Sequence, residues 1–111
     1  MDNTRQMLRH ALATIAYRGG KPLRDAPATF ATFQAAPGVK TPGELVAHIG
    51  DLFEWALSLV KGAQTWQNAH PLPWDREVDR FFATLLAFDA YLASDAPLAC
   101  GEDKLLQGPI A

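Results

Sequence analysis

Apolar side chains recur at steps of three and four residues along three separate segments of the chain, the spacing typical of amphipathic helices. The first segment runs from about Thr4 to Tyr17 and is expected to end at Gly19-Gly20. The second spans Thr41 to Gly62, and the third begins at Asp75 and continues to about Ser94, before Pro97. Three amphipathic helices can form a bundle, so the pattern predicts an all-α fold.

The second helix has the clearest boundaries. Thr41 is a suitable N-cap, and Pro42 fits the first helical position because the missing N–H would have no partner there. Glu44 stands where its carboxylate can reach back to the Thr41 amide. Gly62 provides the stop. The sequence therefore predicts a capped helix over residues 41–62.

The two long connections contain aromatic residues. Residues 21–40 hold several prolines and glycines, so no long element fits there, but Pro27 can open a short helix that turns Phe30 and Phe33 the same way. Core packing is the expected role of both rings, and the wall of a pocket is the alternative. Residues 63–74 carry two tryptophans and two prolines, which predicts a structured loop.

Length and charge narrow the class of protein. The 111 residues are expected to form one domain, residues 1–111. A net charge of -2 without a basic run lacks the electrostatic footprint of a nucleic-acid-binding protein. No apolar run approaches the ~20 residues of a membrane span, so we expect no membrane partner and a cytoplasmic location. The single Cys100 excludes an internal disulfide.

One polar stripe on the second helix can carry chemistry. Glu44, His48, Asp51 and Trp55 follow one another at steps of four, three and four. His48 lies at the edge of the apolar face, where it could bind a metal through one ring nitrogen while Glu44 or Asp51 holds the other. It could equally be a general base, or a partly buried histidine bonded to one of these carboxylates.

Asp89 falls within the apolar arc of the third helix, where a carboxylate must be hydrogen-bonded, neutralised or metal-bound. If the second and third helices were antiparallel neighbours, His48 and Asp89 would each lie about 21 Å from the connecting loop and could meet. If the helices were parallel, the agreement of these two distances would be accidental. The pattern leaves the direction open. His10 and His70 are expected at solvent-facing positions.

The end of the sequence reads as the start of a further element. Gly108-Pro109 indicates a break followed by a helix start, and the sequence stops two residues later. We therefore expect a fourth helix that is truncated or missing in this chain, with the domain incomplete at its C-terminus. Three helices without a fourth would leave apolar surface exposed, which favours dimerisation.

The segments TPGELVAHIGDLFEWALSLVKG, REVDRFFATLLAFDAYLA and KLLQGPIA resemble the DinB/YfiT-like superfamily of metalloenzymes. The resemblance implies a four-helix bundle with an up-down-down-up course, a divalent metal, often nickel or zinc, in a cleft, and frequent homodimers. Some members are thiol-dependent S-transferases or isomerases that use mycothiol, bacillithiol or glutathione. The first metal histidine of the family matches His48. The other two normally lie on the last helix, which this sequence does not reach, so the metal site is expected to be incomplete.

Two functions follow as alternatives. The first is a DinB-like, metal-dependent thiol S-transferase or related enzyme, with His48 as the ligand and Glu44 or Asp51 as acceptors for its other ring nitrogen. The side chains expected near its cleft are Trp55, Phe30, Phe33 and Asp89. The second is a non-catalytic helical bundle that dimerises or binds a partner or a small apolar ligand.

Overall fold

The computed structural model describes residues 2–67 and 71–99, and these form helices and loops without strands. Their elements are α1 (Asn3–Asp25), the short 3-10 helix η1 (Ala28–Thr32), α2 (Pro42–Val60) and α3 (Trp74–Ala93). The all-α prediction is confirmed for this part of the chain. The third helix begins one residue before its predicted start and ends where it was expected. In the described residues, no helix is both long and apolar enough to cross a membrane.

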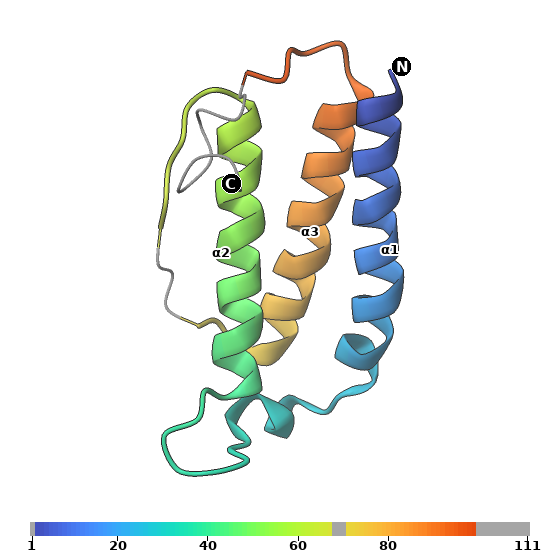
Figure 1. Cartoon of the computed structure of the whole chain (residues 1–111). Helices are drawn as coiled ribbons and strands as arrows, with labels where there is room; N and C mark the ends of the chain where they lie inside the picture. The colour runs from blue at the N-terminus through green and yellow to red at the C-terminus, as the bar shows by residue number, and fades with distance from the viewer. Residues whose placement is uncertain (1, 68–70, 100–111) are drawn as a thin grey trace, which may run out of the picture.

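The three long helices lie side by side, with α3 packed against both α1 and α2 (Figure 1). α1 runs in one direction, and α2 and α3 both run in the opposite direction (Figure 1). Of the two directions that the pattern left open, the parallel one is therefore found (Figure 1). His48 lies six residues after the start of α2 and Asp89 fifteen after the start of α3. Relative to the starts of their helices, the two residues thus differ by nine positions, or about 14 Å at 1.5 Å per residue.

The capping signals of α2 are confirmed. The Thr41 hydroxyl accepts from the Glu44 N–H, and the Glu44 carboxylate accepts from the Thr41 N–H, both at 3.2 Å. Together they form a reciprocal capping box that satisfies two otherwise unpaired donors. At the other end the helix stops at Val60, and Gly62 adopts a left-handed backbone with φ +85°. These capping features all lie within a few residues of the helix ends.

The predicted end of α1 at Gly19-Gly20 is wrong, because the helix continues through both glycines and Pro22 to Asp25. A Cβ at Gly19 would lie 3.2 Å from Cζ of Phe81, and one at Gly20 only 2.7 Å from Cζ of Phe82. The two glycines thus let the phenyl rings of α3 approach the backbone of α1. Their role is interhelical packing rather than termination.

The core lies along α3, which contributes most of its buried apolar side chains. The central cluster consists of Leu12, Val60, Phe81, Leu85, Phe88 and Leu92. Around it, several large apolar side chains stay exposed on the outer helices, including Met7 and Ile15 on α1 and Leu45, Ile49 and Leu52 on α2. The three helices therefore share one core, and α2 also presents a second, uncovered apolar surface.

The prediction that Phe30 and Phe33 pack in the core is wrong. The short helix over residues 28–32 does turn them the same way, and their rings stack with centroids 6.0 Å apart. Both remain exposed. Phe30 meets the edge of Trp74, which is buried at the start of α3. The pair thus covers the end of the bundle where α3 begins.

Candidate functional site

Arg80 of α3 binds several carboxylates at the interface between α2 and α3. Its guanidinium donates to Asp51 at 2.5 Å, to Glu54 at 2.9 Å and to Glu77 at 3.3 Å. It also donates to the carbonyl of Ala47 at 3.2 Å. The hydrogen bond with Glu54 contributes most to raising the pKa of Arg80 above its ordinary value. Asp51 therefore contacts α3 at the seam between the two helices.

Two other acidic side chains of this region are also held by backbone donors. Glu77, almost fully buried, accepts from the Leu72 N–H at 2.9 Å as well as from Arg80. Glu44 is held in the helix cap, where the Thr41 backbone N–H lowers the pKa of its carboxyl. Glu44 and Asp51 were the two acceptors predicted for the His48 ring. In the structure, Glu44 caps the start of α2 and Asp51 binds Arg80 at the seam between α2 and α3.

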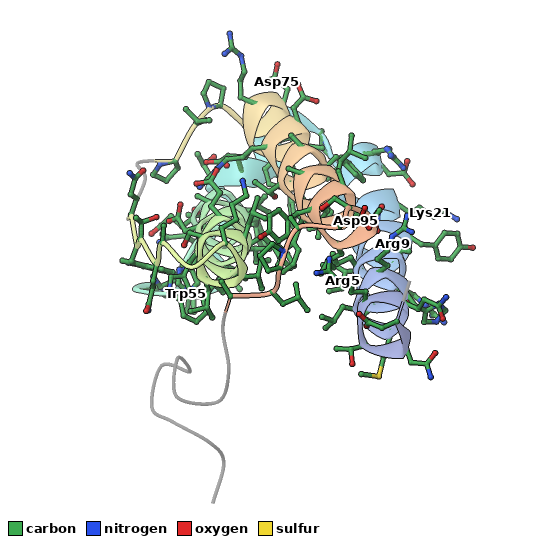
Figure 2. The ribbon with its side chains drawn as sticks, turned by 90° about the horizontal axis from the view of Figure 1, so that it is seen from above. Arg5, Arg9, Lys21, Trp55, Asp75 and Asp95 are labelled. Carbon is green, nitrogen blue, oxygen red and sulfur yellow. The ribbon has the colours of Figure 1, made fainter. Side chains whose placement is uncertain are left out.

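His48 lies instead at a pocket on the other side of α2. The pocket has a volume of about 450 Å³ and is lined by His48, Leu52, Trp55, Gln64 and Trp66. Seen from above, Trp55 lies on the side of α2 that faces away from α3 (Figure 2). The structure therefore places His48 and Trp55 at one pocket, as the stripe on the second helix predicts.

Three aromatic rings surround this pocket. The His48 and Trp66 ring centroids are 6.0 Å apart with an angle of 72° between the ring planes. Trp55 and Trp66 are 6.5 Å apart at 73°. Trp66 thus meets both helical rings nearly at right angles. We name this set of His48, Trp55 and Trp66 the aromatic corner.

Hydrogen bonds hold the loop that carries Trp66 against α2. The Ser58 hydroxyl donates to the Trp55 carbonyl at 2.7 Å and accepts from the Thr65 N–H at 3.0 Å. Thr65 directly precedes Trp66, so the indole is anchored through its neighbour. The sequence pattern indicated a structured loop but did not place Gln64 or Trp66 beside His48, because no periodicity links a loop residue to a helix face.

The other predicted cleft residues lie elsewhere. Asp89 forms a bidentate ion pair with Arg9 of α1, at 2.7 Å and 3.1 Å. The hydrogen bonds from Arg9 are the main reason why the pKa of Asp89 is lowered. The pair borders a separate groove of about 520 Å³ between α1 and α3, on which the exposed His10 also lies. Phe30 and Phe33 do not line the pocket at His48.

The described residues do not assemble a complete metal site. Among them, no group of three histidine, cysteine, aspartate or glutamate side chains is placed to hold a metal ion. Of the described residues that line the pocket, His48 is the one that belongs to these four types. Cys100 and His70 lie outside the described residues. The arrangement seen is therefore an apolar pocket with one imidazole and one amide at its wall.

Comparison of the chain with protein-family models, with curated proteins and with solved structures finds no match.

Proposed function

We propose that this protein is a DinB-like helical bundle that binds a small molecule in the pocket beside His48. Two features support the proposal. The directions of α1, α2 and α3 agree with the first three helices of an up-down-down-up course (Figure 1). His48, the residue that matches the first metal histidine of that superfamily, lies at a pocket rather than in the packed core.

The observation that carries this proposal is the pocket itself. Its volume of about 450 Å³ lies within the ~300–1,000 Å³ of typical small-molecule sites. Leu52, Trp55 and Trp66 supply apolar walls, while His48 and Gln64 offer hydrogen-bonding groups. A few polar groups within an apolar lining are the usual composition of a ligand site.

The resemblance to the DinB/YfiT-like superfamily further implies a divalent metal and a low-molecular-weight thiol. With both, the protein would be a metal-dependent thiol S-transferase or related enzyme. A catalytic metal normally has three protein ligands and one open position. At this pocket, the described lining offers one histidine, His48, and no cysteine, aspartate or glutamate. These residues do not fit a complete metal centre, so the proposal rests on ligand binding and contains no metal-bound step. Binding without turnover, by a non-catalytic bundle, is the alternative function.

Ligand binding is tested by the indole N–H signals of the three tryptophans in an NMR titration. Trp55 and Trp66 line the pocket, whereas Trp74 is 6% exposed and packs against Phe30. With a panel of apolar fragments and with glutathione as probes, we expect shifts at Trp55 and Trp66 and none at Trp74. Shifts at Trp74 alone, or none with any probe, would contradict the proposed site.

The metal-dependent form is tested by elemental analysis of the purified chain. If His48 is a ligand, bound nickel or zinc falls in His48→Ala and is retained in His10→Ala. His10 is a matched control because it is an exposed histidine on α1, at the other groove. Equal metal content in the two variants would remove His48 from any metal site.

A further inference from the structure

The aromatic corner has a geometry that selects among small molecules. Its rings meet at 72° and 73°, so each wall stands nearly perpendicular to the next. Aromatic rings prefer offset-stacked or edge-to-face neighbours, because their faces are electron-rich and their edges electron-poor. A flat ring that stacks on one wall of such a corner directs its edge toward the adjacent wall. Both favourable arrangements are then available to the same ligand.

The charge of the pocket argues against an ionic ligand. None of the described side chains that line it is an aspartate, glutamate, lysine or arginine. The nearby carboxylates of Asp51 and Glu44 are engaged with Arg80 and Thr41. A buried charge without a partner is costly. Indole faces attract cations, so a cationic probe is included in the test below.

The corner is also built before a ligand arrives. Trp55 and His48 are fixed on α2, seven residues and about 10 Å apart along the helix axis. Ser58 fastens the backbone next to Trp66 to the same helix. Trp66 still leaves 43% of its surface exposed, so indole area is available to a ligand. A preformed site loses less entropy on binding than one that must order its walls.

We propose that the pocket takes an uncharged, planar aromatic group, which stacks against the indoles of Trp55 and Trp66 while a polar substituent reaches His48 or Gln64. This inference rests on the proposed function, since it names the class of molecule that the same site binds.

The test compares two probes of the same size that differ in one property. Benzamide has a flat ring, and cyclohexanecarboxamide has a puckered ring and the same amide. If apolar area alone decides, the saturated probe binds as well or better. If stacking decides, benzamide binds about two- to tenfold more tightly. Dissociation constants are obtained from the indole N–H shifts of the full 111-residue chain.

Two variants test whether Trp66 causes the preference for the aromatic probe. Trp66→Leu keeps an apolar side chain but removes one aromatic face, and should bring the two dissociation constants together. Tyr17→Leu removes an aromatic ring that is 80% exposed on α1, away from the pocket, and should leave the preference unchanged. Circular dichroism melts establish that both variants fold.

The outcomes separate this inference from the function on which it rests. Equal affinities, or tighter binding of the saturated probe, would overturn the aromatic preference and leave the pocket as a binding site. Tighter binding of tetramethylammonium than of benzamide would overturn it in favour of an aromatic cage for cations. A preference that survives in Trp66→Leu would also overturn it. If no probe shifts Trp55 or Trp66, the proposed site fails as well.

Discussion

Polar residues on the two sides of α2 lie in opposite environments. Toward α3, Asp51 is buried and paired with Arg80, whose guanidinium also binds Glu54 and Glu77. On the other side, His48 stays exposed at an apolar pocket with Trp55. Asp51 lies only three positions after His48 in the sequence. One helix thus carries a charge network that holds the bundle together and a pocket whose aromatic walls are left accessible.

Among the variants considered, Arg80→Met should lower the free energy of unfolding the most. Asp51 and Glu77 are 5% and 1% exposed, so loss of their cation leaves two buried carboxylates without it. Removing one partner from a buried ion pair costs about 3–5 kcal/mol. We expect a loss of that size in the free energy of unfolding, measured by urea denaturation.

The matched control for Arg80→Met is Arg76→Met, an exposed arginine on the same helix. It should change the free energy of unfolding by no more than about 0.5 kcal/mol. If both variants lost equally little, the network around Arg80 would be electrostatically unimportant, and the two sides of α2 would not differ in stability.

Gly50→Ala perturbs the same seam more mildly. A Cβ at this position would lie 2.9 Å from Cζ and Nη1 of Arg80, so the paired guanidinium must shift. Overpacking of this kind costs about 1–3 kcal/mol, and the better helix propensity of alanine returns up to about 1 kcal/mol. A net loss of about 1 kcal/mol in urea denaturation is expected. A gain in stability would show that Arg80 moves aside without losing its partners.

On the pocket side, His48→Ala should have a smaller effect on folding than either seam variant. The imidazole is exposed and contacts Trp66 at a ring distance of 6.0 Å. Its loss should change the free energy of unfolding by less than about 1 kcal/mol. Probe binding at Trp55 and Trp66 should nevertheless weaken, as followed by the indole N–H titration. A loss as large as that of Arg80→Met would mean that this side also stabilises the bundle.

The helices could be predicted where short-range contacts determine them. Thr41, Glu44 and Gly62 set the ends of α2 through bonds or backbone angles within a few residues of one another. Gly19 and Gly20 were wrongly predicted to end α1. Their role depends on contacts with phenyl rings of α3, which lie far along the chain. Likewise, periodicity placed Asp89 in a buried arc, but its partner Arg9 on α1 could not be deduced from the pattern.

The candidate site was predicted in part for the same reason. His48 and Trp55 share a helix face, so their spacing is sufficient to bring them to one pocket. Asp51 belongs to the same stripe by spacing, but it lies near the boundary between two faces, and the position of Arg80 decides which one it joins. Trp66 comes from a loop, whose path depends on the Ser58 hydrogen bonds. Helical periodicity contains no information about that path.

The smallest expected effect concerns the ion pair between α1 and α3, which is about one-third exposed, unlike Arg80 and its partners. Arg9 lowers the pKa of Asp89 below its ordinary 3.8, so the charged carboxylate stabilises the fold above that value. This stabilisation is lost as the pH falls through the lowered pKa. Asp89→Asn should therefore make the free energy of unfolding depend less steeply on pH below about 4, as measured by urea denaturation. Asp79→Asn, an exposed position on the same helix, should keep the original slope. An unchanged slope in Asp89→Asn would mean that solvent screens this pair completely, and that burial alone separates it from the network around Arg80.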